Sequence, residues 1–513
     1  MRNTLALSAA LLAGLVGCTT PGSAPPSPAA SARAASNSTV QDALWLDRLT
    51  WGATSADLAA VRRDGRAAWL DAQLQARTAP LPEAAQAQIS ALSIQQPLPA
   101  LVQKMEAQRK AADALTDDTA KAEAQKAYQQ ALTQLAREAS TRALLQALYS
   151  PQQVQEQLTW FWFNHFNVHQ YKANLRAMVG DYEQGLRERS LGRFRDLLGY
   201  TAHHPAMLRY LDNDQNAANR INENYARELL ELHTLGIGGG YSQRDVQELA
   251  RVLTGLGVNL TGDKPKLKPA QDAQYRRDGL TEFNPARHDF GDKTLLGLNV
   301  KGEGYAELDR VLDLLARHPS TARFVCSKLA QSFVADEPPP ALVARMAERW
   351  KQTDGRIAEV LRAMVAAPEF EASLGRKFKD PSHYVVSAVR LAYADKVVLN
   401  TAPMIGWLYR LGQAPYNRQT PDGYPLDENA WAGPGQMTTR FEIARAIGSG
   451  SAGLFKVEGE RKDRPAFPQL THPLYYEAIA PRLAPATQQA LGQATSPQEW
   501  NTYLLASPDF MHR

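Results

Sequence analysis

Cysteine is nearly absent from this chain of 513 residues, which contains only Cys18 and Cys326. If the thiol of Cys18 is lipidated, Cys326 has no partner and no intrachain disulfide forms, even in an oxidising compartment. The stability of the folded chain must therefore come from a packed core, which a chain of this length supplies easily.

The chain also lacks a large charge and the familiar catalytic signatures. Its formal net charge is +4 at pH 7 and no block of lysine or arginine stands out, which argues against a nucleic-acid partner. No GxSxG elbow, HExxH zinc motif, Walker loop or Rossmann fingerprint occurs, so the sequence offers no support for the enzyme classes that carry them. Beyond the N-terminal segment, no apolar run is long enough to cross a membrane.

The N-terminal segment has the parts of a bacterial lipoprotein signal peptide, which we assign to residues 1–18. Arg2 supplies a positive charge, an apolar run too short for a stable anchor follows, and Leu-Val-Gly-Cys forms a cleavage box that ends at Cys18. We expect lipidation of Cys18, whose diacylglyceryl group would tie the protein to a membrane. Because Thr19 rather than Asp follows, we expect the periplasmic face of the outer membrane. The alternative is an ordinary signal peptide with an incidental cysteine.

The remaining chain predicts a tether and then a helical domain. Residues 19–40 are mainly Pro, Ser and Ala, which indicates a disordered tether. Over residues 41–513 apolar side chains recur at helical spacing, so the expected class is mainly α, a multi-helical globular domain with small irregular or hairpin insertions and long loops. Residues 103–141 predict a protruding helical insertion. We expect a hairpin around residues 294–300 and a long loop over residues 413–436.

The stretch NENYARELLELHTLG predicts a helix over residues 222–235 with several ionisable side chains. Arg227, Glu228 and Glu231 fall on its polar face, and His233 falls among its leucines. A buried imidazole needs a hydrogen-bond partner, which makes His233 a candidate for chemistry. The alternative is an amphipathic helix with a solvated face and an ion pair between Arg227 and Glu231.

The stretch TWFWFNHFNVH, residues 159–169, has aromatic side chains on every side of a helical wheel. This helix should be buried all round, so Asn164 and His165 would sit in apolar surroundings, where an unpaired polar group is costly. His165 and His169 have the spacing of two metal ligands on one helix face. The alternative is a core His165 bonded to a neighbour, with His169 at the surface.

Two loops carry further candidates. Arg287, His288 and Asp289 follow a proline, and a histidine beside an aspartate in irregular backbone suits proton transfer or metal binding. The same composition is also common in turns. In the second loop Tyr424 and Trp431 could line a binding cleft with flat amphipathic surfaces.

Taken together, these motifs resemble a bacterial family known only as domain of unknown function 1800. The resemblance covers essentially the whole mature chain, and the motifs occur in one order. This chain departs at the insertion over residues 103–141 and at His169. The motifs are RLTWGATSADLAAVRRDGRAAWLDAQL from Arg48, WFNHFNV from Trp162, GDYEQGLRERSLGRFRDLL from Gly180, HPAMLRYLDN from His204, NENYARELLELHTLG from Asn222, YSQRDVQELARVLTG from Tyr241, HDFGDKTLLG from His288 and PDGYP from Pro421.

The resemblance implies an exported, largely helical bacterial protein with no established activity. It also implies a neighbour, because the family is often encoded beside a second exported family similar to sulfatases and alkaline phosphatases. Because the family shares the polar side chains of its motifs, these side chains become candidate site residues. Carried over motif by motif, they are Asn164, His165, Asn224, Arg227, Glu228, Glu231, His233, His288 and Asp289.

Our leading hypothesis is a membrane-tethered extracytoplasmic hydrolase that acts on an envelope or environmental polymer, such as a glycan or its esters. It requires side chains from separate segments to meet in one cleft. Glu228 and Glu231 alone could share a metal, but they could not flank a scissile bond without a third carboxylate. The alternative is a non-catalytic lipoprotein that binds or presents an exported sulfatase-like partner.

The hypothesis gives each candidate a role. A glutamate would serve as general acid or base, a histidine would relay protons or bind a divalent metal, and Arg227 would hold an anionic group. The catalytic candidates are Glu228, Glu231, His233, His288, Asp289 and Arg227, the substrate-binding candidates are Asn164, Asn224, Tyr424 and Trp431, and the metal-ligand candidate is His165.

Overall fold

The computed structural model describes residues 28–75, 80–456 and 466–513. The predicted signal peptide and Cys18 lie outside these residues. Within the described part of the chain, no helix combines the length and the apolar character needed to cross a membrane.

The predicted tether is partly wrong. Helix α1 runs from Pro28 to Leu49, so residues 28–40 are helical. The segment is rich in alanine, the strongest helix former, and it continues directly into the apolar residues of the domain. Only residues 19–27 of the predicted tether lie outside the described chain.

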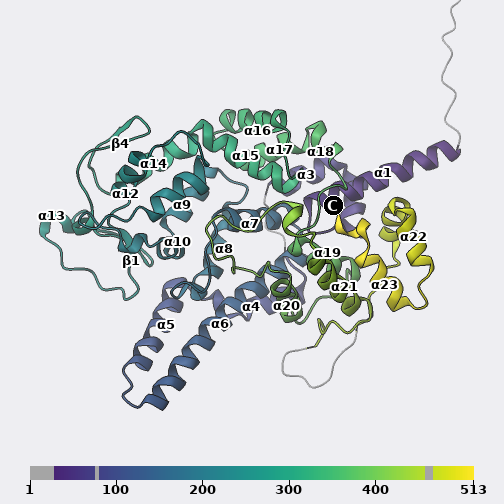
Figure 1. Ribbon diagram of the computed structural model, residues 1–513, viewed down its shortest axis with the longest axis horizontal. Coiled ribbons are helices and arrows are strands. Elements are labelled where there is room, and N and C mark those ends of the chain that lie inside the picture. The colour runs from purple at the N-terminus through teal and green to yellow at the C-terminus, as the bar shows by residue number, and fades with distance from the viewer. Residues whose placement is uncertain (1–27, 76–79, 457–465) are drawn as a thin grey trace, which may run out of the picture.

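The chain is mainly α, as predicted, and its helices surround the central helix α7 (Figure 1). The N-terminal helices are α1, α2 (Ser55–Asp64), α3 (Arg66–Leu74), α4 (Glu83–Ser90), α5 (Leu98–Asp113), α6 (Asp118–Tyr149), α7 (Gln153–His165), α8 (Val179–Arg189), α9 (Phe194–His203) and α10 (Pro205–Tyr210). The middle helices are α11 (Asn224–Glu228), the π-helix η4 (Leu229–Thr234), α12 (Gln243–Val252), α13 (Pro269–Asp272), α14 (Ala306–Arg317), α15 (Pro319–Phe333), α16 (Pro340–Gln352), α17 (Ile357–Val365) and α18 (Pro368–Ala372). The C-terminal helices are α19 (Pro381–Ala392), α20 (Ala402–Arg410), α21 (Pro434–Gly448), α22 (Pro485–Gly492) and α23 (Pro497–Ala506).

Of two small antiparallel sheets, the first packs against α10 and the second against α12 and α14. The first has the strand order β1-β3-β2, formed by β1 (Leu256–Val258), β2 (Arg276–Asp278) and β3 (Thr281–Phe283). The second is the hairpin expected around residues 294–300, in which β4 (Lys293–Leu295) pairs with β5 (Leu298–Val300). These strands occupy the edge of the molecule that is farthest from α22 (Figure 1).

Helix α7 lies at the centre of the core, as its aromatic sequence predicted. Trp162 is fully buried, and its indole N–H donates to the carbonyl of Ser190 at 2.9 Å. Phe161 and Phe163 are also buried, and Trp160 is half-buried. Because α7 is buried in the core, it holds Asn164 and His165 at its C-terminal end in fixed positions.

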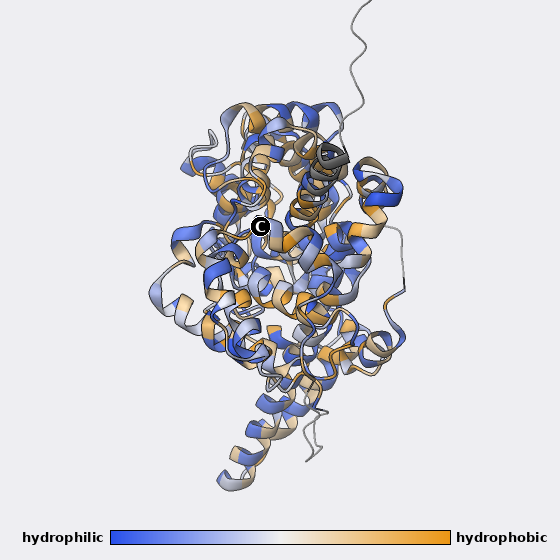
Figure 2. Ribbon diagram, turned by 90° about the vertical axis from the view of Figure 1, so that its right-hand side faces the viewer, coloured by the Kyte–Doolittle hydropathy of each residue, from blue (hydrophilic) through white to orange (hydrophobic). Residues whose placement is uncertain are grey.

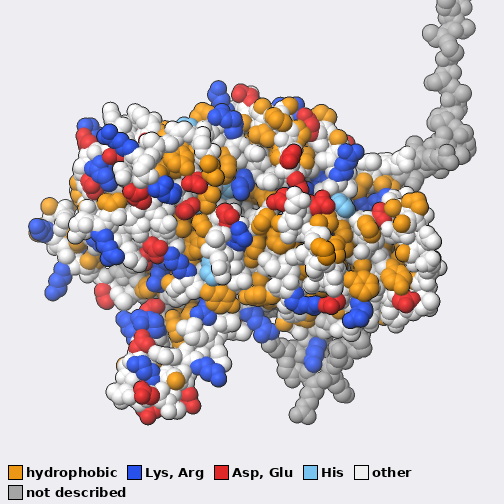
Figure 3. All heavy atoms as spheres, viewed as in Figure 1, with side chains coloured by type: hydrophobic (Ala, Val, Ile, Leu, Met, Phe, Trp, Pro, Cys, Tyr) orange, Lys and Arg blue, Asp and Glu red, His pale blue; other side chains and the backbone are white. Residues whose placement is uncertain are grey.

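Helices α5 and α6 pack against each other and project from the body (Figure 1). The projecting tip carries many hydrophilic residues (Figure 2). The opposite end of α6 is different, because Leu144, Ala147 and Leu148 are buried against the core. Charged side chains of both signs are spread over the face shown in Figure 3, in keeping with the small net charge.

The expected long loop connects α20 to α21. It contains one short 3₁₀ turn, Glu428–Ala430, and α21 begins at Pro434, slightly earlier than expected. The loop lies over the C-terminal end of α7 and is held there by hydrogen bonds. The carboxamide of Asn167 donates to the carbonyls of Arg418 and Thr420 at 3.0 and 2.8 Å.

Candidate functional site

Asn164 connects the end of α7 to the loop that contains Tyr424. Its carboxamide donates to the Tyr424 carbonyl at 3.0 Å and accepts from the Tyr424 N–H at 2.6 Å. Gly423 has a φ of +77°, and any Cβ at that position would collide with the backbone of Asn164. The side chain of Asn164 is thus used to hold the loop, and its polar atoms already have partners.

The anchored loop brings Asp422 into the electrostatic surroundings of Glu228. Partial burial raises the pKa of Glu228, and the negative charges of Glu231 and Asp422 raise it further against the opposing charge of Arg227. Burial likewise raises the pKa of Tyr210, to which the charges of Asp422 and Glu228 both contribute. Asp422 is therefore a third carboxylate whose charge acts on Glu228.

The pKa of Asp422 moves in the opposite direction. Its partial burial alone would raise the pKa, but hydrogen bonds from Thr420 and Arg418 and the charges of Arg418 and Lys328 lower it overall. The guanidinium of Arg418 forms an ion pair with Asp422 at 3.0 Å. The pKa values of the two carboxyl groups are thus shifted in opposite directions.

Lys328 on α15 interacts electrostatically with both Asp422 and His165. Burial lowers the pKa of Lys328 and the charge of Asp422 raises it, with a net lowering. The charge of Lys328 in turn helps to lower the pKa of His165. The ammonium also stands over the Phe324 ring at 5.9 Å.

His165 and His233 lie side by side in the core. The Nε2 of His165 is 3.1 Å from the backbone carbonyl of His233, and the ring centroids are 6.3 Å apart. Burial lowers the pKa of His165 well below its usual value and that of His233 to about 3. Both ring nitrogens of His233 are buried without a hydrogen-bond partner among the described residues. These imidazoles are therefore neutral at physiological pH.

The segment that carries His233 is not the regular helix predicted over residues 222–235. Helix α11 ends at Glu228 and η4 follows as a π-helix. The N–H of Leu235 donates to the carbonyl of Leu230 at 2.8 Å, five residues back. The hydroxyl of Thr234 donates to the Leu229 carbonyl at 2.6 Å. π-Helical turns are frequent at functional sites.

The expected pair of histidine ligands on one helix face is wrong. Helix α7 ends at His165, so His169 lies outside the helix and the spacing of one turn does not apply. No group of three or more His, Cys, Asp or Glu side chains in the described ranges is arranged to hold a metal ion.

Three of the predicted polar residues on α11 and η4 have an ion-pair or hydrogen-bond partner nearby. Arg227 forms its ion pair with Glu223 at 3.2 Å, one turn earlier, and the alternative of a pair with Glu231 is wrong. Glu231 accepts a hydrogen bond from the Tyr241 hydroxyl at 3.3 Å. The side chain of Asn224 donates to the Leu211 carbonyl at 3.1 Å and joins this segment to α10.

His288 belongs to a separate buried cluster. Its Nδ1 is 2.7 Å from the Thr254 carbonyl, and its Nε2 is 3.0 Å from Glu307. Lys293 contacts the other oxygen of Glu307 at 2.5 Å, and the side chains of both are fully buried. None of these partners of His288 contacts Glu228 in the described part of the chain. The expected single cleft therefore does not include the loop that carries His288.

Asp289 is also occupied by structural contacts. Both of its carboxylate oxygens accept from Arg251, at 2.8 and 3.1 Å, and its N–H donates to the hydroxyl of Thr254 at 2.8 Å. The hydrogen bonds from Arg251 are the largest cause of its lowered pKa. Asp289 therefore closes a turn against α12.

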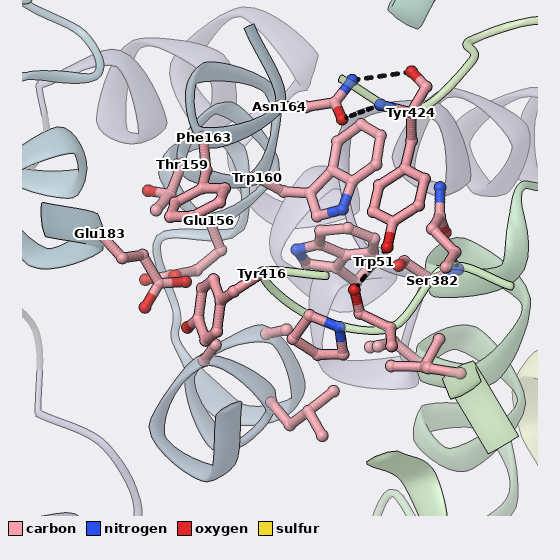
Figure 4. A pocket seen from close by; sticks show the side chains of 18 of the residues that line it. Trp51, Glu156, Thr159, Trp160, Phe163, Asn164, Glu183, Ser382, Tyr416 and Tyr424 are labelled. Carbon is pink, nitrogen blue, oxygen red and sulfur yellow. Dashed lines mark hydrogen bonds between the residues drawn. The ribbon is translucent and has the colours of Figure 1, made fainter. Parts of the chain in front are cut away.

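Tyr424 and Asn164 line an aromatic cavity of about 90 Å³ behind the loop. Tyr424 donates to the Ala414 carbonyl at 2.8 Å. Trp431 does not line this cavity, since its indole N–H donates to the Pro425 carbonyl at 3.0 Å and its ring packs 6.3 Å from that of Tyr424. In the view of Figure 4, Trp160 and Tyr424 lie on one side of the cavity and Tyr416 on the other.

The residues that sequence reasoning missed are Asp422 and Lys328. The sequence signal for Asp422 was present, because it lies within the PDGYP motif of the expected long loop, where only Tyr424 and Trp431 were candidates. Lys328 follows the helical pattern of α15, and nothing in that pattern distinguishes it from an exposed lysine.

A comparison with known protein families covers nearly the whole helical domain. No curated protein and no solved structure matches the chain. One family model matches residues 44–512, which include α7, the π-helix and the long loop. The chain therefore belongs to the family described as Protein of unknown function (DUF1800).

Proposed function

We propose that the protein is an exported, membrane-tethered hydrolase that cleaves a glycan or ester bond in an envelope or environmental polymer. The observation that carries this proposal is the electrostatic interaction of Asp422 with Glu228, two groups whose pKa values are shifted in opposite directions, that of Glu228 upwards and that of Asp422 downwards. Environments that push the pKa values of two neighbouring groups apart are typical of acid and base partners.

Glu228 is the proposed general acid. A raised pKa keeps a carboxyl group protonated closer to neutral pH, so that it can donate its proton to the oxygen of the leaving group. The two contributions from Glu231 and Asp422 depend on the ionisation of those neighbours, which couples the acid to its partner.

Asp422 is the proposed ionised partner. As a carboxylate it would activate a water molecule or stabilise the positive charge that develops on a sugar carbon. Arg418 and Lys328 keep it ionised and offer positive charge to an anionic group on the polymer. The imidazoles of His165 and His233, whose pKa values are lowered by burial, take no proton in this scheme.

The predicted location outside the cytoplasm supports a polymer substrate. The lipobox that ends at Cys18 would hold the enzyme at a membrane surface outside the cytoplasm. A tethered enzyme in that compartment meets envelope glycans and their esters directly.

The test is hydrolysis of labelled envelope polysaccharides and ester substrates by the mature protein and its variants. Glu228→Gln and Asp422→Asn should each lower kcat/KM by about 10²- to 10⁴-fold, and Glu228→Gln should remove the alkaline limb of the pH profile. Glu223→Gln is the matched control, because Glu223 lies beside the same segment but pairs with Arg227 at the surface.

Folded Glu228→Gln and Asp422→Asn variants that hydrolyse at the wild-type rate would contradict the proposal. So would a wild-type protein that hydrolyses none of the substrates and binds a co-expressed sulfatase-like protein equally well with and without these substitutions. The second result would favour the non-catalytic alternative.

A further inference from the structure

A pocket beside α23, which we call the C-terminal pocket, has a volume of about 500 Å³. It is lined by residues 467–471 and by residues on either side of the start of α23. This volume is within the range of about 300–1,000 Å³ that is typical of sites for small ligands. Helices α22 and α23 lie at the end of the molecule opposite the strands (Figure 1), and the pocket residues do not belong to the segments that carry Glu228 and Asp422.

The described residues that line the C-terminal pocket carry no formal charge. Hydroxyl and amide groups supply its polarity, and these groups both donate and accept hydrogen bonds. An ionic ligand would lose part of its hydration here without gaining a counter-ion. The lining therefore favours an uncharged ligand with several hydrogen-bonding groups. The polar residues are Gln469, Thr471, Thr495, Ser496 and Asn501.

Two aromatic side chains of the lining are accessible to a ligand. Phe467 is 39% exposed, and Trp500 is partly exposed. The Trp500 ring packs edge-on against Tyr475, with the ring centroids 5.0 Å apart, which fixes its orientation. Its indole N–H has no acceptor among the described residues, yet it is not one of the fully buried N–H groups, so it is open to solvent. Trp500 thus offers a ligand both an apolar ring and a hydrogen-bond donor.

Asn501 offers an acceptor on the same helix. Its side-chain N–H donates to the Gly448 carbonyl of α21 at 3.3 Å, which fixes the carboxamide. The side-chain oxygen has no donor within the described chain and is not fully buried. Because Asn501 is otherwise buried and lines the pocket, we assign this accessible oxygen to the pocket wall. A wall that is fixed before binding loses little conformational entropy when a ligand binds.

A pyranose sugar has the two kinds of surface that this lining accommodates. The C–H bonds of the ring form an apolar face, which can pack against an aromatic side chain. The hydroxyl groups around the ring both donate and accept, as the amide and hydroxyl groups of the lining do. A purely apolar ligand would leave these polar groups without partners, and a charged ligand would find no opposite charge.

We propose that the C-terminal pocket binds an uncharged pyranose sugar as part of a neutral oligosaccharide or polysaccharide. The ring packs against Trp500 or Phe467, and its hydroxyl groups form hydrogen bonds with the indole N–H of Trp500 and the amides of Gln469 and Asn501. This site is separate from the carboxyl pair, and sugar binding there does not depend on Glu228 or Asp422 being catalytic.

The test is calorimetric titration of the mature protein with three neutral tetrasaccharides and one charged one. The neutral probes are cellotetraose, maltotetraose and tetra-N-acetylchitotetraose, and at least one should bind with a Kd of about 1 mM or below. Tetragalacturonate, which carries a carboxylate on each ring, should bind at least about tenfold more weakly than the best neutral probe, because the pocket has no cationic side chain.

Variants with matched controls assign binding to the pocket. Trp500→Ala and Phe467→Ala should each weaken binding of the best neutral probe by about tenfold or more, whereas Tyr476→Ala, which removes a more exposed aromatic ring outside the pocket, should not.

Gln469→Ala should weaken binding by about three- to tenfold through the loss of one hydrogen-bonding group. Gln489→Ala, at an exposed position of α22 outside the pocket, is its control and should bind as the wild type does. Because Phe467 and Gln469 are exposed, their variants remain informative even if Trp500→Ala fails to fold.

Three results would overturn the proposal. These are the absence of saturable binding by all three neutral probes, tetragalacturonate binding as tightly as the best of them, or unchanged binding in Phe467→Ala and Gln469→Ala proteins with the native circular dichroism spectrum. Because no step of this experiment measures hydrolysis, its failure is distinct from failure of the proposed enzymatic function.

Discussion

The buried histidines His288 and His233 come from two motifs that looked equally suited to chemistry, and the structure treats them differently. His288 has a partner at each ring nitrogen, the Thr254 carbonyl and the Glu307 carboxylate. His233 is just as buried, yet neither of its ring nitrogens has a partner within the described chain. The first histidine belongs to a satisfied polar network, and the second is held in the core by packing alone.

The carboxylates of the two regions differ in the same way. Glu307 would have a raised pKa from burial alone, but hydrogen bonds from His288 and Lys293 lower it overall. Glu228 has no such donors among the residues that the structure describes, and burial and neighbouring negative charges raise its pKa. Buried charges that pair with one another stabilise a fold. A titratable group whose pKa is perturbed and that lacks such a partner is a candidate for binding or catalysis.

The largest expected effect is in the satisfied network. Glu307→Ala should lower the free energy of unfolding by about 3–5 kcal/mol, because it leaves the ammonium of Lys293 buried without its counter-ion. Glu303→Ala, which removes a half-exposed partner of Arg310, should cost less than about 1 kcal/mol. Urea denaturation of both variants measures the difference. Equal losses would show that the buried cluster is no more structural than a surface pair.

The second effect concerns the histidines without partners. The pKa of His233 is lowered to about 3, so below about pH 6.5 the unfolded chain binds a proton that the folded chain does not. The free energy of unfolding should therefore fall as pH decreases, by up to about 1.4 kcal/mol per pH unit for each such histidine. His165, whose pKa is also lowered by burial, adds to this slope.

His233→Leu should make that slope shallower by up to about 1.4 kcal/mol per pH unit, measured by urea denaturation from neutral to mildly acidic pH. His512→Gln controls for the loss of an imidazole from a more exposed position near the C-terminus. An unchanged slope in His233→Leu would mean that His233 finds a partner in solution, and the contrast with His288 would disappear.

The fold was largely predictable because it depends on local patterns. The aromatic run of α7 indicated a buried helix, and a hairpin was expected around residues 294–300, and both are present. The start of α1 was missed because composition suggested a tether, while alanine propensity favours a helix. The π-helix at Leu229–Thr234 was missed because the wheel assumes one spacing throughout.

The candidate site was less predictable because its contacts are long-range. Asn164 and Tyr424 are 260 positions apart, and no pattern within either segment indicates that they are hydrogen-bonded to each other. The motifs identified polar residues but could not separate Asp289, whose pKa is lowered by its partner, from Glu228, whose pKa is raised by its surroundings. That distinction depends on partners such as Arg251 and Asp422, which only the folded chain brings near.

The smallest expected effect is the most direct test of the comparison, because it has opposite signs in the two regions. The raised pKa of Glu228 means that ionisation of this group costs the folded state free energy as pH rises above the pKa of the unfolded chain. Glu228→Gln should therefore raise the free energy of unfolding at neutral and alkaline pH, by less than about 1 kcal/mol because the side chain is half-exposed and screened by solvent. The gain should vanish in acid, where wild-type Glu228 is protonated.

Glu307→Gln should instead be destabilising at neutral pH, since the ionised form of Glu307 is the one that its partners stabilise. Paired denaturation curves at acidic and neutral pH measure both signs, and a loss of stability in Glu228→Gln at neutral pH would place Glu228 among the structural residues rather than the catalytic ones.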